Sequence, residues 1–194
     1  MAESNVETRK RLVAAAADML SRRGLSSTSI RELAKHAQAP LGSTYHYFPN
    51  GKQQVVTEAV EYAGEVVARA LGKALEAGPV PGLRAFLGLW RDIITKSRFR
   101  AGCPVLAVSV EEPSGEEARA ALRAAATVFG QWESLLANSL RKNGASKRQA
   151  EEIATLVVAS VEGTVALCRA KRSAVPLDRV ATQLEAAVRA AVRS

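Results

Sequence analysis

A short segment near the N-terminus concentrates side chains that can contact a charged polymer. The chain has nine Phe, Tyr and Trp residues in 194, and three of them lie within four positions of GSTYHYF (residues 42–48). His46, one of two histidines, stands among them, and Lys52 follows. Aromatic clusters are more often part of a core, but a core does not need Tyr-His-Tyr beside Gly-Ser-Thr. The segment is therefore a candidate binding element.

The first residues of this segment suit the leading edge of a helix that enters DNA. The major groove is about 12 Å wide, so the leading side chains must be small. Gly42, Ser43 and Thr44 meet this requirement. Leu41 and the methyl group of Thr44 can contact a thymine methyl group, and Ser43 can bond to a base edge or a phosphate.

The rings that follow cannot all point the same way, because Tyr45, His46 and Tyr47 are consecutive. One ring should pack against the preceding helices, and the others should offer O–H or N–H groups to phosphate. Phe48 is predicted to be a core residue. Lys52 begins the next helix, where an ammonium group and free backbone N–H groups both favour a phosphate.

The elements that must position these residues are helices, because no stretch shows sustained alternation of apolar and polar residues. The first helix is predicted over Val6–Arg23, with Gly24 as its stop. A short helix follows in SSTSIRELAKHA, where Ser29 and Glu32 have the spacing of a capping box. A third covers LGSTYHYF. Two short helices joined by a tight turn, after a longer helix, predict a helix-turn-helix module.

The start of the second of these helices offers further DNA contacts. Thr28 and Ser29 carry hydroxyl groups beside backbone N–H groups that can bind a phosphate. Arg31 follows within the first turn and can reach the groove or the backbone. All three residues are predicted to contact DNA.

The rest of the chain is predicted to form longer helices. The fold class is all-α: a three-helix DNA-binding module over residues 1–51 and a six-helix body over residues 52–194. The helices of the body are predicted at residues 52–77, 83–97, 103–110, 116–143, 146–171 and 177–192.

Residues 9–56 resemble the DNA-binding module of the TetR family of bacterial transcriptional regulators. The shared features are a basic, alanine-rich first helix, a Gly and a Thr before the second, a Leu-Ala pair within it, and a Gly-x-x-Tyr-x-Tyr-Phe segment with a lysine beyond. In this sequence they are Gly24, Thr28, Leu33–Ala34, Gly42, Tyr45, Tyr47, Phe48 and Lys52. The resemblance implies a homodimeric regulator that binds double-stranded operator DNA and a small molecule.

Two features depart from the usual family pattern. The residues QAP at 38–40 replace a Gly-Val-Ser turn, so Pro40 is predicted to open the recognition helix as its first-turn proline. Asn50–Gly51 adds one residue, which leaves the placement of Lys52 open. The longer FPNGK form, with RAGCPVLAVSVE in the body, is similar to a branch that includes lincomycin-resistance and flavonoid-responsive repressors.

The segment ATLVVASVEGTVALC (154–168) has one charge in fifteen residues, so it is too apolar for a helix with a solvent face. The resemblance implies that the last two helices, 146–171 and 177–192, pair with those of a second copy, and this pairing would explain the apolar composition. A buried central helix of a monomer would also explain it. The single charge, Glu162, can bond to the partner, line a ligand cavity or reach solvent at a gap.

The body also contains all six remaining Phe, Tyr and Trp rings, which either fill the core or line a cavity for a hydrophobic or aromatic effector. In family members a ligand cavity lies between such helices. The predicted ligand-binding residues are Phe86, Trp90, Leu106, Val110, Phe129, Trp132 and Glu162.

Several classes of function are disfavoured. Gly51–Lys52 lacks the glycine of a Walker loop, since His46 stands in its place, and no GxSxG or G-x-G-x-x-G is present. With two histidines and two widely spaced cysteines, Cys103 and Cys168, no metal, cofactor or catalytic site is predicted. No membrane segment or signal peptide is predicted, and the protein is expected in the cytoplasm.

Charge supports the DNA-binding prediction weakly. The net charge is +8, and residues 1–56 carry eight Lys and Arg against four Asp and Glu. Such a bias suits phosphate contact.

The predicted function is a ligand-responsive regulator, a repressor released from a palindromic operator by a small hydrophobic molecule. The alternative is a helical carrier or scaffold that does not bind specific DNA.

Overall fold

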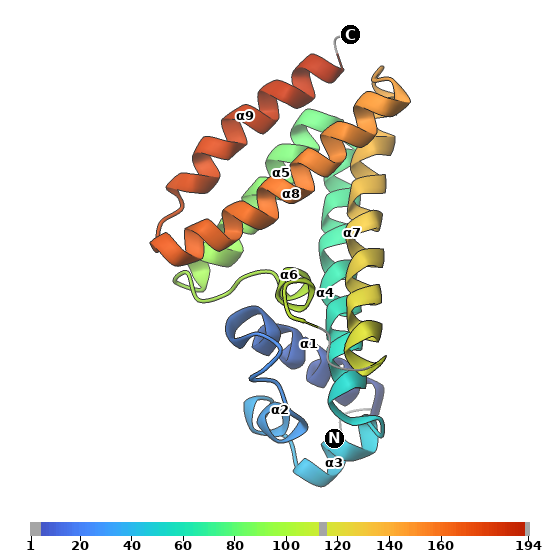
Figure 1. Cartoon of the computed structure of the whole chain (residues 1–194), viewed down its shortest axis with the longest axis vertical. Coiled ribbons are helices and arrows are strands. Elements are labelled where there is room, and N and C mark those ends of the chain that lie inside the picture. The colour runs from blue at the N-terminus through green and yellow to red at the C-terminus, as the bar shows by residue number, and fades with distance from the viewer. Residues whose placement is uncertain (1–4, 113–115, 193–194) are drawn as a thin grey trace. The chain divides into compact units, whose positions relative to one another are not determined.

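The computed structural model describes residues 5–112 and 116–192, and these residues form nine α-helices and no strand (Figure 1). The all-α prediction, with three helices followed by six, is confirmed. The helices are α1 (Asn5–Arg23), α2 (Ile30–His36), α3 (Leu41–Tyr47), α4 (Gly51–Leu75), α5 (Pro79–Lys96), α6 (Pro104–Ser109), α7 (Glu116–Lys142), α8 (Lys147–Lys171) and α9 (Val175–Ala191).

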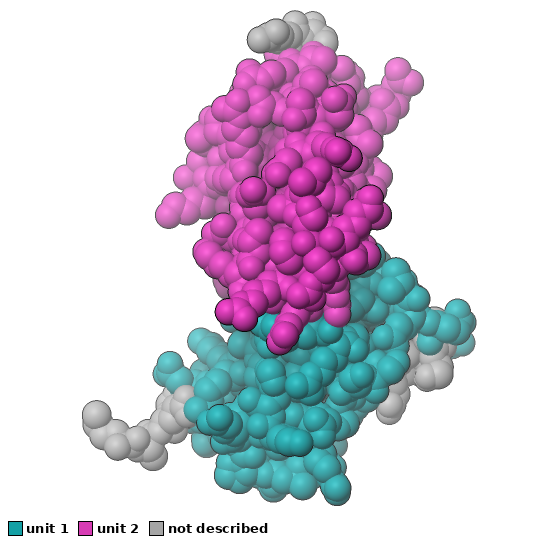
Figure 2. Space-filling model, turned by 90° about the vertical axis from the view of Figure 1, so that its left-hand side faces the viewer, with its two compact units in different colours: residues 1–65, 103–128 teal, residues 66–102, 129–194 magenta. Residues whose placement is uncertain are grey.

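The chain forms two compact units, which Figure 2 shows in teal and magenta. The first consists of Met1–Glu65 and Cys103–Val128, and the second of Val66–Gly102 and Phe129–Ser194. Helices α4 and α7 contribute residues to both. This division does not follow the boundary predicted between residues 51 and 52, because the first unit also takes in α6 and parts of α4 and α7.

The core of the first unit begins with the apolar face of α1. Leu12, Ala16, Met19 and Leu20 are all fully buried, as their helical spacing predicts. Helix α1 packs against α2 and α6, and α2 packs against α3. Helix α1 therefore lies between α6 and the short helices of the module.

Two helices begin two or more residues earlier than the sequence predicted, and both have a proline in the first turn. Helix α5 was predicted to begin at residue 83, but it begins at Pro79. Helix α9 begins at Val175, with Pro176 in its first turn. The first N–H groups of a helix have no partner within it, so a proline there costs no hydrogen bond. The helices predicted from residues 83 and 177 therefore begin at Pro79 and Val175.

The second unit is built around α8, which packs against α9 and α5. Among the described helices, α8 is the one long and apolar enough to cross a membrane, and 44% of its most apolar stretch is buried in the protein. A core helix of a helical domain has the same composition.

Cys168 on α8 is free and buried, and burial raises the pKa of its thiol.

Ion pairs join α5 to α9 at the surface of this unit. Arg84 donates two hydrogen bonds to Glu185, from Nε at 2.7 Å and from Nη2 at 2.6 Å. Arg189 also donates to Glu185, at 2.8 Å. These bonds lower the pKa of Glu185 from its ordinary value of 4.5 to about 2, and the bond from Arg84 has the largest effect. Asp178 accepts from Arg91 at 2.8 Å between the same helices.

Acid should therefore weaken the attachment of α9. The folded pKa of Glu185 is the lower one, so its contribution to stability is present above pH 4.5 and is lost as the pH falls toward 2. We expect Glu185→Gln to reduce the loss of thermal stability between pH 5 and 2, measured by circular dichroism. Glu152→Gln, in a 3.8 Å surface pair with Arg148, is the control. An unchanged pH dependence in Glu185→Gln would contradict the assignment.

Candidate nucleic-acid interface

The N-terminus of α2 is held by two hydroxyl groups. The Ser29 side chain is the N-cap and accepts a hydrogen bond from the Glu32 N–H at 3.1 Å, as the capping-box spacing predicts. The Thr28 hydroxyl donates to the Gly24 carbonyl at 3.0 Å, and Thr28 is 1% exposed. Arg31, by contrast, is exposed in the first turn of α2.

The turn between α2 and α3 is tight and includes one residue in the left-handed region. Gln38 has φ of 52°, and the Ala39 N–H donates to the Ala34 carbonyl at 2.8 Å. Pro40 then takes the N-cap position of α3 with extended backbone (φ −60°, ψ 134°). It was predicted to be a first-turn residue, but it lies one place earlier, and its carbonyl accepts from the Thr44 N–H at 3.1 Å.

Helix α3 presents a narrow exposed edge. Gly42 leaves open space, since a Cβ atom added there would meet no atom within 4 Å. Leu41 is 38% exposed and Tyr45 is 54% exposed. The exposed residues of this edge are Pro40, Leu41, Gly42, Ser43, Tyr45 and His46. These side chains are exposed, and their contact with DNA stays a prediction.

Two residues predicted to contact DNA are instead internal supports. Thr44 is 0% exposed, and its hydroxyl donates to the Pro40 carbonyl at 3.1 Å. Thr28 is likewise buried and bonded to Gly24. Their hydroxyl and methyl groups cannot reach a base or a phosphate, because the module itself surrounds them. The predicted contacts of Thr28 and Thr44 are therefore corrected to structural roles.

One ring packs back toward α1, as the sequence predicted, and it belongs to Tyr47. Its hydroxyl donates to Asn5 Oδ1 at 3.0 Å, and its ring meets that of His46 edge to face at 5.7 Å. Phe48 follows and is 0% exposed, as predicted for a core residue. The Arg9 guanidinium lies 5.5 Å from the centre of the Phe48 ring. The end of α3 is thus attached to α1 through Tyr47 and Phe48.

A hydrogen-bonded network places Lys52. The Gln54 side chain accepts from the Asn50 N–H at 3.2 Å and donates to Glu58 Oε1 at 3.0 Å. Arg9 also pairs with Glu58. The chain turns at Gly51 (φ 68°), and α4 begins there, so Lys52 stands exposed in the first turn. Lys52 was predicted to begin the helix, and it lies one place after the first residue of α4.

The network residues were not found from sequence. Gln54 and Glu58 are four apart on α4, a spacing that could have signalled a pair. Arg9 and Glu58 are 49 positions apart, and no local pattern relates them.

A carboxylate beyond α6 supports the turn before α2. Glu111 accepts from the Leu25 N–H at 2.9 Å and from the Ser26 hydroxyl at 3.0 Å. Gly24, in the left-handed region at φ 76°, brings the backbone so close that an added Cβ would lie 3.3 Å from Glu111 Oε1. The residues are 85 and 86 positions apart, so this contact too had no sequence signal.

Positive charge remains available on this unit. Arg31, Lys35 and Lys52 are exposed, and none forms an ion pair with a described residue. Elsewhere charge is neutralised internally, since Asp18 contacts both Arg22 at 2.8 Å and His36 at 3.1 Å. Exposed cations beside a slim helix can bind phosphates while the helix reads base edges.

The predicted ligand-binding rings form a packed cluster in the second unit. The ring centres of Phe86, Trp90 and Trp132 are 6.4 Å apart in each pair, edge to face, and Phe129 lies 5.6 Å from Trp132. The Trp90 indole N–H is buried and meets no hydrogen-bond partner within the described part of the chain.

The other predicted ligand residues are distributed differently. Leu106 and Val110 belong to the first unit, and Val110 is 72% exposed. Their grouping with the rings stays a prediction. Glu162 is 5% exposed beside the buried Val161 and Val165, which excludes a carboxylate that reaches solvent. Across the described ranges no three His, Cys, Asp or Glu side chains are placed to hold a metal ion.

Comparison with known proteins is consistent with this geometry. The sequence model of the TetR family of bacterial regulatory proteins matches residues 12–59. The model described as "Transcriptional regulator LmrA/YxaF-like, C-terminal domain" matches residues 79–183. Together they cover the helix-turn-helix module and most of the remaining helices.

Whole proteins agree. An HTH-type transcriptional regulator of Mycobacterium tuberculosis strain H37Rv is 40% identical over 179 residues, 91% of each chain. The HTH-type transcriptional regulator LmrA of Bacillus subtilis is 28% identical over 91% of this chain and 94% of its own. The crystal structure of a regulatory protein TetR from Rhodobacter sphaeroides has the same fold, with a TM-score of 0.81 at 24% identity over 93% of this chain and 98% of that one. The chain therefore belongs to the TetR family of bacterial transcriptional regulators, with a C-terminal domain of the LmrA/YxaF-like type.

Proposed function

We propose that the chain is a homodimeric repressor that leaves a palindromic operator when a small hydrophobic molecule binds its body. The observation that carries the proposal is the exposed edge of α3, which combines open space at Gly42 with nearby exposed cations such as Lys52. A regulator of this kind acts in the cytoplasm, on double-stranded DNA. A carrier or scaffold would have no use for such an edge.

The proposed DNA contacts fall into two groups, those of the exposed edge of α3 and those at its margins. Leu41, Gly42, Ser43, Tyr45 and His46 lie on the exposed edge of α3 and face the bases or the adjacent phosphates. Ser29, Arg31, Pro40, Tyr47 and Lys52 complete the interface at its margins. Arg31 and Lys52 contribute charge, which strengthens binding to any sequence.

The charge of Lys52 gives a direct test of DNA binding. We expect Lys52→Ala to lower affinity for all duplex sequences and to reduce the slope of log affinity against log salt by about 1, because one phosphate contact is lost. Fluorescence anisotropy with promoter DNA over a range of salt measures both. Lys73→Ala, an exposed site in the last turns of the same helix, is the control. An unchanged salt slope would favour the carrier function.

Gly42 tests whether α3 enters a groove. A methyl group there meets no protein atom, so Gly42→Ala should keep or raise stability, by up to about 1 kcal/mol, as for Ala over Gly in a helix. Operator affinity should nevertheless fall at least about tenfold, because the methyl group occupies space reserved for a base pair.

Gly88→Ala on α5 is the matched control, since a Cβ there also meets nothing within 4 Å. It should leave DNA binding unchanged. Full operator affinity in Gly42→Ala would show that the edge of α3 does not dock closely.

The outer face of α8 supports the dimer. Leu156 is 46% exposed and Leu167 is 49% exposed, although the inner face of the same helix is buried. Ala159, Gly163 and Ala166 lie between them and are also exposed. These five positions follow a helical stripe of apolar and small residues, which a second copy can cover. A central helix of a monomer would not leave this stripe exposed.

Charge on this stripe should separate the subunits. We expect the wild type to have about twice the chain mass of 20.6 kDa in light scattering, and Leu156→Arg with Leu167→Arg to be monomeric and to lose operator affinity. Val66→Arg, at a site on α4 that is 39% exposed, should remain a dimer. A dimeric double variant would contradict an interface at α8.

The ring cluster suggests what the effector looks like. Phe86, Trp90 and Trp132 offer apolar contact, and the Trp90 N–H offers one hydrogen bond, so the effector that we propose is a flat apolar molecule with an acceptor group. A coupling of about 3 kcal/mol between effector and operator would change affinity by more than a hundredfold. A bound effector that leaves operator affinity unchanged in calorimetry would contradict the release step.

A further inference from the structure

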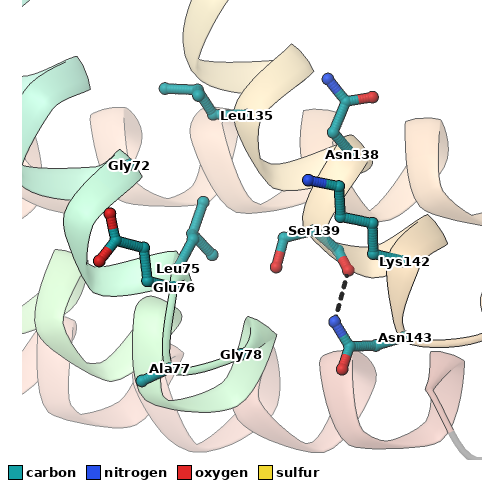
Figure 3. A pocket seen from close by; sticks show the side chains of 10 residues that line it. All are labelled: Gly72, Leu75, Glu76, Ala77, Gly78, Leu135, Asn138, Ser139, Lys142 and Asn143. Atoms are coloured by element: carbon teal, nitrogen blue, oxygen red, sulfur yellow. Dashed lines mark hydrogen bonds between the residues drawn. The ribbon is translucent and has the colours of Figure 1, made fainter.

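A site that is lined by none of the clustered rings lies at the C-terminal ends of α4 and α7 within the second unit. It is a pocket of about 530 Å³ (Figure 3). One wall is the end of α4 with the turn that follows, and the other is the last turns of α7. The lining residues are Gly72, Leu75, Glu76, Ala77, Gly78, Leu135, Asn138, Ser139, Lys142 and Asn143.

The two walls carry opposite charges. Glu76 stands on the α4 side, and Lys142 extends its amino group from α7 toward the space between them (Figure 3). Both side chains are exposed, and neither takes part in an ion pair or side-chain hydrogen bond with a described residue. Each charge is therefore available to a ligand rather than to its neighbours.

The apolar part of the pocket comes from Leu75 and Leu135, one from each wall. Leu75 is held from behind by α5, because a Cβ atom at Gly82 would lie 2.4 Å from its Cδ2 atom. On the other wall the Asn143 amide donates to the Ser139 carbonyl at 2.8 Å (Figure 3). Both walls are thus held in place by contacts behind or along them.

We propose that this pocket binds a small zwitterion, a molecule that carries a carboxylate and a protonated amine on an apolar body, as an α-amino acid does. Lys142 pairs with the carboxylate, and Glu76 pairs with the amine. The C-terminal ends of two helices add partial negative charge that also favours the amine. The volume is within the range of small-molecule sites.

The alternatives fit less well. A purely apolar molecule would displace water from Glu76 and Lys142 and give neither charge a new partner, which costs free energy. A simple anion would satisfy Lys142 but would lie near Glu76 and two negative helix ends. A ligand with both charges satisfies each wall.

Three matched probes separate these chemistries: L-leucine, 4-methylpentanoate, which lacks its amine, and 3-methylbutylamine, which lacks its carboxylate. Each is titrated into the full-length protein and followed by NMR. We expect leucine to shift the Gly72 and Gly78 backbone amides and the Asn143 side-chain amide. Each singly charged probe should bind at least about tenfold more weakly, since one charged hydrogen bond is lost.

Two variants assign the charges. Glu76→Gln should abolish the preference for leucine over 4-methylpentanoate, and Lys142→Gln should abolish the preference over 3-methylbutylamine. Both sites are exposed, so thermal stability should stay close to that of the wild type. Lys73→Gln, on α4 but outside the pocket lining, is the control and should keep both preferences.

Three results would overturn the proposal. They are the absence of leucine-dependent shifts at these amides up to the solubility limit, a singly charged probe that binds as tightly as leucine, and preferences that survive both variants. The proposal does not depend on operator binding, because the readout is ligand binding alone. Failure of the zwitterion site would therefore leave the repressor proposal standing.

Discussion

The exposed edge of α3 depends on how the C-terminal end of this helix is held. A helix of seven residues has too few internal hydrogen bonds to persist alone, so tertiary contacts must stabilise it. The largest of these contacts is the buried Phe48 ring, whose burial contributes about 1.5–3 kcal/mol. Arg9 covers the ring and pairs with Glu58, so a single guanidinium links α1, the end of α3 and α4.

This anchor explains the division of labour along α3. Thr44 and Phe48 are four positions apart, on one face of the helix, and both are buried. Leu41 and Tyr45 have the same spacing on another face, and both are exposed. The side chains that face inward hold the helix in place, and those that face outward are free to contact a partner.

Much of this could be predicted from the sequence. The helices follow from apolar periodicity, the cap of α2 from the spacing of Ser29 and Glu32, and the burial of Phe48 from its character. The burial of Thr44 could also have been found, because it shares a face with Phe48. Its small size was read as a requirement of the groove, whereas it is a requirement of the core.

The remaining errors have two physical causes. Two helices were predicted to begin after Pro79 and Pro176, although the first turn of a helix accepts proline without loss. The supports at Arg9 and Glu111 join residues tens of positions apart, and a single sequence carries no signal for such pairs. The families identified by comparison define the fold, but they do not report these contacts.

The contact between Glu111 and the turn at Leu25 also bears on how such regulators can be recombined. An engineered sensor is often imagined as the DNA-binding helices of one protein joined to the ligand-binding body of another at a single junction. A junction after residue 51 would replace Glu111 with a foreign residue and remove the acceptor for the Leu25 N–H and the Ser26 hydroxyl. The part to transfer between proteins is discontinuous, because residues 103–128 form one compact unit with residues 1–65.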